Sequence, residues 1–479
     1  MNLINHILKK LPEYNTLRDL SEKNVPCGIT GLSSIHRAHI ISALRQDTGR
    51  CLLVVCQDDL AAARMAEELQ GFLGEKPPIL PTRELSLIGS AAVSRGWEHQ
   101  RLSMLHHLGT QGYPVLIASA EALALRTMPK STLFSSAISL VVGGSYDMDT
   151  LSHKLTHLGY RRSTLVEGTG QFALRGGILD VFSPGAPAPV RAEFFGDELD
   201  SMGYFDTTTQ RRTENIEEIN LLPTAEVLPE LHPGGREGLA ADLSALIARQ
   251  KRRKHINEPL IDTLTRDREA IENGALFSGS DRYTALIYPE FSCAMDYISP
   301  ETMVIFSDRI AVERSLGNHL EELSAGLDSL LENGSLVGEL CDFYKNFDEL
   351  CNLCSEKCVI YMDNFLSAKY PESLPPKELL SVTVKQLPSY GGSLDAAVSD
   401  LSHYAGSGFS TLVLCGTERR AQLLLESLRA ANVTAYVDVT DLEEGEYELP
   451  VEIRIEGGSM EGVSFLTTPA TVLVTLSRK

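Results

Sequence analysis

The sequence predicts an α/β fold in which a parallel-sheet domain is interrupted by a small antiparallel α+β domain and followed by a second small α/β domain. Three observations support this prediction. Apolar runs alternate with helical patterns at the start, turn-rich strand alternation follows, and a strand–helix pattern returns near the end. We expect 1–140 and 224–372 to form the first domain, 141–223 the inserted domain and 378–479 the third.

The parallel sheet is predicted from short apolar runs that precede helical patterns. "CLLVVC" (51–56), "PVLIAS" (114–119) and "ISLVVGG" (138–144) are continuous apolar runs, as strands buried on both faces require. Strand–helix–strand repetition implies parallel strands with right-handed crossovers. "TMVIFS" (302–307) and "CVIYMD" (358–363) would complete the sheet after the insertion.

The inserted domain is predicted from strand alternation between turn residues. In "VRAEFF", alternation places Arg191, Glu193 and Phe195 on one face, and in "QFALRG" Arg175 also points away from the apolar side. Arginine with an exposed aromatic is typical of protein–protein contacts, although a merely solvated outer face would show the same pattern. We expect the outward side chains to matter little for folding, and Phe194 to lie in the core.

The third domain is separated from the first by a stretch that reads as a linker. "SAKYPESLPPKE" (367–378) is polar and rich in proline. After it, "GSLDAAVSDLSHYAGSG" and "TERRAQLLLESLRAAN" have helical spacing, whereas "STLVLCG" and "VTAYVDV" are strand-like.

Composition and charge exclude several classes of protein. The chain has 479 residues with 43% hydrophobic and 22% charged residues, an ordinary globular mixture without an apolar run long enough to span a bilayer. Nine scattered cysteines and an amphipathic N-terminus that does not resemble a signal peptide favour the cytoplasm. The net charge of −21 disfavours DNA as the main partner. The basic run Arg249 to His255 is either a helix end or a patch for nucleic acid or for an acidic partner, and the net charge disfavours nucleic acid.

The segment "GLSSIHRA" is aligned with the phosphate-binding pattern G-x-x-x-x-G-K-[ST] but departs from it. Gly31 opens the pattern, while His36, Arg37 and Ala38 stand where glycine, lysine and a hydroxyl residue belong. An ATPase also needs acidic residues at the end of a buried strand, and "ISLVVGG" ends in two glycines. Taken alone, the segment is either a degenerate phosphate-binding loop or a coincidence.

The cysteines Cys351, Cys354 and Cys358, with Cys341 upstream, superficially resemble a metal cluster. Zinc sites usually pair two C-x-x-C units or combine cysteine with histidine, and no second pair occurs here. The spacings of three and four would place the three cysteines on one helix face as buried apolar side chains. We therefore predict no metal site.

From residue 159 to 223 the sequence closely resembles the second domain shared by bacterial transcription-repair coupling factors and the excision-repair protein UvrB. The resemblance rests on "RGGILDVF", "FFGDELDS" and the "FDTTTQR" stretch, and with flanking segments it covers about three quarters of the chain. The last hundred residues resemble the third domain of the coupling factors. The resemblance implies a degenerate helicase-like, P-loop-type first domain and a UvrA-binding insert, with Arg175, Arg191 and Phe195 at the UvrA surface.

The same resemblance implies a non-catalytic adaptor that recruits UvrA to stalled RNA polymerase. It implies an N-terminal fragment, because the motor motifs that bind ATP and magnesium do not occur here. That C-terminal motor region would be an intramolecular partner, and RNA polymerase and DNA would be reached through other parts of the full protein. The alternative is a UvrB-like damage-clamping ATPase, which the altered loop and the absence of tyrosine from residues 80–105 disfavour.

Overall fold

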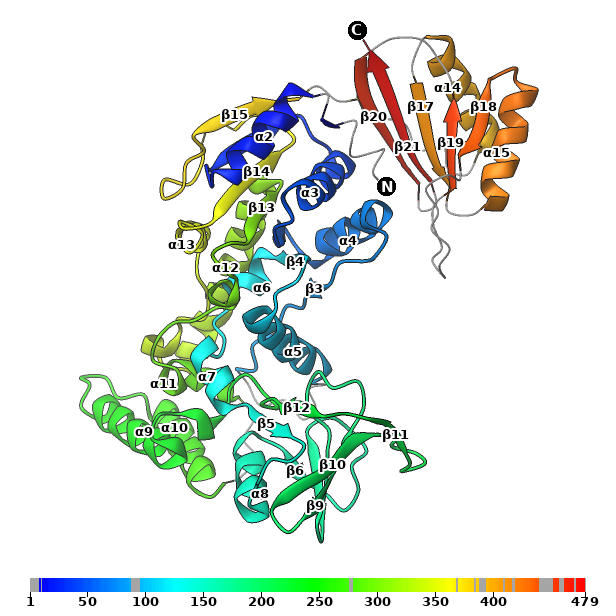
Figure 1. Cartoon of the computed structure of the whole chain (residues 1–479). Coiled ribbons are helices and arrows are strands. Elements are labelled where there is room, and N and C mark those ends of the chain that lie inside the picture. Colours follow the sequence, from blue (N-terminus) through cyan, green and yellow to red (C-terminus); the bar gives the residue numbers. More distant parts are fainter. Residues whose placement is uncertain are drawn as a thin grey trace.

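The computed structural model describes the chain apart from residues 1–7, 10, 88–94, 275–278, 368, 383–384, 387–392, 408–409, 416–417, 439–450, 456–460, 469–470 and 479. The described residues form a parallel-sheet domain, an inserted lobe and a C-terminal domain with a separate sheet (Figure 1). No helix in the described ranges combines the length and the apolar character that crossing a bilayer requires.

A seven-stranded parallel sheet forms the centre of the first domain. Its strand order is β15-β1-β14-β13-β2-β4-β3. The strands are β1 (Cys27–Thr30), β2 (Leu52–Cys56), β3 (Ile79–Leu80), β4 (Val115–Ser119), β13 (Met303–Ser307), β14 (Cys358–Asp363) and β15 (Glu378–Ser381). Every residue of β2, β4, β13 and β14 is buried, which confirms the strands predicted at these apolar runs.

Helices cover both faces of this sheet because successive strand residues point to opposite sides. Leu52 and Val54 pack with helices α2, α3 and α4, whereas Leu53 and Val55 pack with the helices of the other face. The first group is α2 (Pro12–Glu22), α3 (Ser34–Thr48) and α4 (Asp59–Leu73). The second group is α5 (Gly96–Thr110), α6 (Ala120–Ala124), α7 (Lys130–Ser136), α12 (Arg309–Glu332) and α13 (Phe347–Asn352). The same core extends beyond the sheet to α9 (Gly235–Lys251), α10 (Glu258–Glu272) and α11 (Thr284–Ile287).

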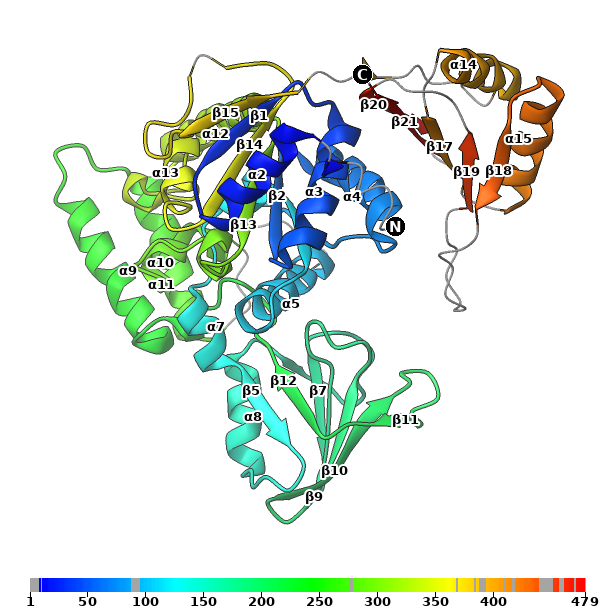
Figure 2. The same cartoon turned by 45° about the horizontal axis from the view of Figure 1, so that its top comes forward.

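The inserted lobe is a six-stranded sheet with one helix against it (Figure 2). The strand order is β11-β10-β9-β8-β7-β6, antiparallel except for the pair β6 and β7. The elements are α8 (Met148–His157), β6 (Arg161–Arg162), β7 (Gln171–Arg175), β8 (Ile178–Val181), β9 (Val190–Phe195), β10 (Glu198–Phe205) and β11 (Arg212–Asn215). Leu151 and Leu155 of α8 pack with Phe172, Leu179 and Ala192, and we call this side the inner face and the opposite side the outer face.

The run "ISLVVGG", predicted as a strand of the parallel sheet, belongs instead to the insert. It forms β5 (Ile138–Val141), which pairs antiparallel with β12 (Glu218–Leu221). Within β5 only Leu140 is buried, so one side of the strand faces outward. The insert therefore begins before residue 141. The prediction failed because so short an apolar run fits a half-buried pair of strands as well as the centre of a parallel sheet.

The C-terminal sheet has the predicted helices and strands in a mixed arrangement. Its order is β16-β20-β21-β17-β19-β18, and only β16 and β20 run parallel. The elements are β16 (Lys385–Gln386), α14 (Leu394–Gly406), β17 (Ser410–Cys415), α15 (Glu418–Ala430), β18 (Ala435–Asp438), β19 (Val451–Ile455), β20 (Glu461–Thr468) and β21 (Thr471–Arg478). The expected start at residue 378 is too early, because β15 pairs with β1 of the first sheet.

Candidate functional site

The loop after β1 is too short to surround a phosphate group. Helix α3 begins at Ser34, so only residues 31–33 connect it to β1. His36, Arg37 and Ala38 consequently lie inside the helix, and all three are buried. A phosphate-binding loop needs a longer run of backbone amides that curve around the anion, and this connection cannot supply it.

Gly31 is required here for contact with the protein's own backbone. Its φ is +90°, and a Cβ at this position would lie 1.9 Å from the carbonyl oxygen of Val382. The chain leaving β15 therefore packs directly against the start of the loop. Close backbone packing therefore explains why a glycine stands at the start of the apparent phosphate-binding pattern, without any ligand.

Arg37 is held by side chains at the carboxyl ends of neighbouring strands. Its Nη1 donates to Asn364 Oδ1 at 3.1 Å and lies 3.9 Å from Asp308 Oδ2. Asn364 Nδ2 donates to the same Asp308 oxygen at 3.0 Å. Burial lowers the pKa of Arg37, and the Asp308 carboxylate partly opposes this effect. The arginine is thus tied to the sheet edge rather than presented to a ligand.

The expectation that this edge has no acidic residues is wrong, because it was drawn from β5, which lies elsewhere. Asp308 directly follows β13, and Asp363 ends β14. Asp308 caps α12 by accepting from Ala311 N, while Asp363 accepts from Arg309 N at 2.8 Å. Burial raises the pKa of Asp363. Both carboxylates are therefore present but engaged by the protein itself.

His36, next to Arg37 in α3, is a neutral side chain. Its Nδ1 is 2.7 Å from Ser33 Oγ. Burial, and then the neighbouring Arg37 charge, lower the pKa of His36 to about 4. A neutral buried imidazole adds no positive charge that a phosphate group could use.

The outer face of the insert presents a second cluster of arginine and aspartate. Two glycine hairpins set its register: Gly176 at φ +60° joins β7 to β8, and Gly196 at φ +65° joins β9 to β10. Asp180 of β8 then lies opposite Arg191 of β9. The predicted residues Arg175 and Arg191 are brought together through this aspartate, which the sequence reasoning missed.

Asp180 is buried and binds both arginines. Its Oδ1 accepts from Arg191 Nε at 2.7 Å and its Oδ2 from Arg191 Nη2 at 2.9 Å. Oδ2 also accepts from Arg175 Nη2. The only signal in the sequence was a charged residue between the apolar residues of "ILDV", and the pairing of β8 with β9, which the sequence does not specify, sets it opposite Arg191.

The two arginines differ in exposure. The side chain of Arg175 is 47% exposed and that of Arg191 only 19%, because Arg191 also packs over the Phe205 ring at 4.7 Å. From these contacts we now expect Arg191, unlike Arg175, to contribute to folding stability. Phe195, the last residue of β9, is 85% exposed. Phe194 points inward but is only partly buried, with an edge contact to Tyr146.

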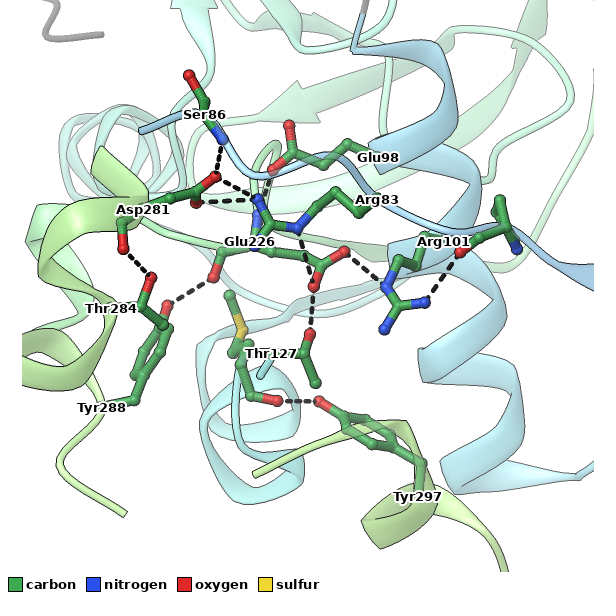
Figure 3. A network of polar contacts seen from close by, with 12 residues as sticks. Arg83, Ser86, Glu98, Arg101, Thr127, Glu226, Asp281, Thr284, Tyr288 and Tyr297 are labelled. Carbon is green, nitrogen blue, oxygen red and sulfur yellow. Dashed lines mark hydrogen bonds and ion pairs between the residues drawn. The ribbon is translucent and has the colours of Figure 1, made fainter. Parts of the chain in front are cut away.

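A buried network of charges joins the exit of the insert to the first domain (Figure 3). The side chain of Glu226 lies between Arg101 Nε at 3.0 Å and Arg83 Nε at 3.6 Å. It also accepts from Thr127, and Arg83 binds Asp281 on its other side. These residues are far apart in sequence, so no local pattern announced the network. It fixes the segment through which the chain leaves the insert.

The remaining candidates from the sequence have structural places. Cys351 lies in α13, Cys354 lies in the turn after this helix, and Cys358 is the first residue of β14. The three cysteines therefore do not share the single helix face that was predicted. Burial raises the pKa of Cys354 to about 12 and that of Cys358 to about 11. Among the described residues no group of three or more His, Cys, Asp or Glu side chains could hold a metal ion. Of the basic run, Arg249 and Lys251 lie in the last turn of α9.

Comparison with known proteins identifies relatives of both the insert and the larger chain. Residues 138–226 match the family model described as the UvrB interaction domain. Transcription-repair-coupling factors from Bacillus subtilis and Myxococcus xanthus are 26% and 28% identical over 85% and 86% of this chain. The factor from Staphylococcus epidermidis is 23% identical over 95% of it. The chain spans 34%, 35% and 38% of these relatives, about a third of their length.

Proposed function

Because the insert matches a UvrB interaction domain and most of the chain is similar to transcription-repair-coupling factors, we propose that this chain is the UvrA-docking module of such a factor. The module is a non-catalytic adaptor that recruits UvrA, and with it excision repair, to RNA polymerase stalled at DNA lesions. The polymerase and DNA contacts and the ATP-driven translocation belong to parts of the relatives that this chain does not span.

The outer face of the insert is the observation that carries this proposal. Phe195 offers an exposed apolar anchor, and Arg175 offers a guanidinium that is half exposed. Binding hot spots are enriched in aromatic and arginine side chains. An exposed arginine fork also gives charge-assisted hydrogen bonds to carboxylates or carbonyls. The same family model that identifies the domain covers both residues.

A UvrB-like damage-clamping ATPase is the alternative. Asp308 and Asp363 at the carboxyl edge of the parallel sheet are the feature that favours it, since such acids hold magnesium in ATPases. Arg37 and Arg309 occupy those carboxylates, and Val382 closes the loop at Gly31. The alternative is therefore the weaker of the two.

The test compares two equally exposed phenylalanines. Phe195 lies on the outer face, whereas Phe365, 80% exposed, follows β14 in the first domain. Phe195→Ala should weaken binding to immobilised UvrA by about tenfold or more, as the loss of a hot spot does, and Phe365→Ala should leave it unchanged. Equal affinity of the two variants for UvrA would refute the assignment of this face.

In the same proposal the docking surface is covered by the motor region of a longer protein until the motor engages. This chain alone should then bind UvrA more tightly than a full-length factor that contains it. Equal affinity of the short and long proteins for UvrA would remove autoinhibition from the proposal and leave docking in place.

A further inference from the structure

We propose that Asp180 is a positioning residue that divides the work of the two arginines: Arg191 is locked as part of the scaffold, and Arg175 alone is held ready for an acidic or carbonyl-bearing segment of UvrA. This inference rests on the proposed docking function and names the chemistry of the partner at that surface.

The hydrogen bonds of Arg191 show that it is already committed. Its Nε and Nη2 bind Asp180 in a two-pronged pair, its Nη2 also donates to Gln210 Oε1 at 3.3 Å, and its Nη1 donates to Gln210 O at 3.1 Å. A guanidinium has five N–H donors, so the described contacts use four of them. The Phe205 ring covers its face.

Arg175, in contrast to Arg191, makes few contacts within the chain. Its one described hydrogen bond runs from Nη2 to Asp180 Oδ2, and the side chain is 47% exposed, so its remaining donors have no described partner within the chain. Phe195 lies on β9 beside this face, with its ring exposed. A partner that fits both features has a carboxylate or backbone carbonyls near an apolar pocket.

Asp180 prepares Arg175 for binding in two ways. A single carboxylate between two guanidiniums reduces their mutual repulsion and leaves this group of three side chains with one net positive charge. A free arginine side chain also loses rotamer freedom when it binds a partner. Since Asp180 is buried on a strand and already orients Arg175, part of that cost is met before the partner arrives.

A double-mutant cycle on UvrA affinity tests the proposal. Asp180→Asn keeps the shape of the side chain and removes its charge. It should weaken UvrA binding about tenfold in the wild type, and should have little further effect when Arg175→Ala is already present, because Asp180 acts through Arg175. An equal loss in both backgrounds would overturn the positioning role.

A second variant keeps the test valid if Asp180→Asn does not fold. Arg175→Lys preserves the charge on an exposed side chain but removes the planar fork. It should lose nearly as much UvrA affinity as Arg175→Ala, and wild-type affinity would overturn the proposal. Phe195→Ala, measured alongside, distinguishes failure of the proposed docking function from failure of this inference. If Arg175→Lys and Phe195→Ala both bind UvrA normally, the docking function is wrong; if only Arg175→Lys does, this inference alone is wrong.

Discussion

Two of the clusters in which arginine and aspartate side chains meet among the described residues have opposite consequences. At the carboxyl edge of the parallel sheet, the Arg37 side chain is 9% exposed and is bound by the protein's own Asp308 and Asn364. On the outer face of the insert, the Arg175 side chain is 47% exposed and has one described partner, Asp180. The residue types are the same, but only the second cluster leaves donors for another molecule.

The comparison teaches that burial, rather than residue type, decides whether such a cluster can bind a partner. Removing charges from water is costly, so a buried cluster persists only if its members satisfy one another. At the edge of the parallel sheet the charged side chains are paired with one another inside the protein, and Val382 packs where a ligand would approach Gly31. The outer face keeps one carboxylate buried and one arginine in solvent, which suits contact with a protein.

The most buried cluster should give the largest effect when it loses one partner. Glu226 is fully buried between Arg83 and Arg101. Glu226→Ala should lower the free energy of unfolding by about 3–5 kcal/mol, because two arginines lose their shared carboxylate. Urea unfolding measures this, with exposed Glu217→Ala as the control. A change within about 0.5 kcal/mol of that control would contradict the ranking by burial.

His36 should make the edge of the parallel sheet sensitive to acid. Burial lowers its pKa to about 4 from an unfolded value of 6.5. The unfolded chain therefore takes up a proton first, and stability present above pH 6.5 is lost as the pH falls towards 4, by about 3 kcal/mol in total. His36→Leu should flatten this part of the curve of unfolding free energy against pH. Exposed His153→Leu is the control, and identical curves for all three proteins would exclude the effect.

The two arginines of the outer face should separate in a stability measurement. Arg191→Ala removes most of the bonds to buried Asp180 and should cost about 1–3 kcal/mol of unfolding free energy. Arg175→Ala, at an exposed position, should cost less than about 0.5 kcal/mol. Similar losses for both variants in thermal unfolding would remove the distinction between scaffold and contact.

The smallest effect is expected from nucleotide. A ligand at a hundred times its Kd stabilises the folded state by about 2.7 kcal/mol, which a melting curve detects readily. With the loop at Gly31 closed by Val382, millimolar Mg·ATP should leave the melting temperature unchanged. A concentration-dependent increase, together with a one-to-one calorimetric isotherm, would restore the ATPase alternative.

Strand periodicity was sufficient to predict much of the fold and part of the site. The fully buried runs of β2, β4, β13 and β14 announced the parallel sheet, and alternation in β9 placed Arg191 and Phe195 on one face. The run at β5 was assigned to the wrong sheet, because an apolar run does not say which strand it pairs with. That error also hid the acids at the sheet edge.

Contacts that depend on strand pairing could not be predicted locally. Asp180 gains its role from the hairpin register that sets it opposite Arg191. Glu226 meets Arg83 and Arg101 across more than a hundred residues of chain, and Gly31 meets Val382 only because β15 joins β1. The sequence identifies residues of the right chemistry, whereas tertiary packing determines which of them are already satisfied.

The exposed half of the outer face, Arg175 and Phe195, is the surface that we propose for UvrA. Arg175→Ala combined with Phe195→Ala tests it most directly, because both side chains are exposed and the variant should fold normally, as circular dichroism can verify. In calorimetric titrations with UvrA, the wild-type chain should give a one-to-one isotherm, and the double variant should bind at least about a hundredfold more weakly, the sum of two hot-spot losses. Equal affinity of the two folded proteins for UvrA would contradict the account.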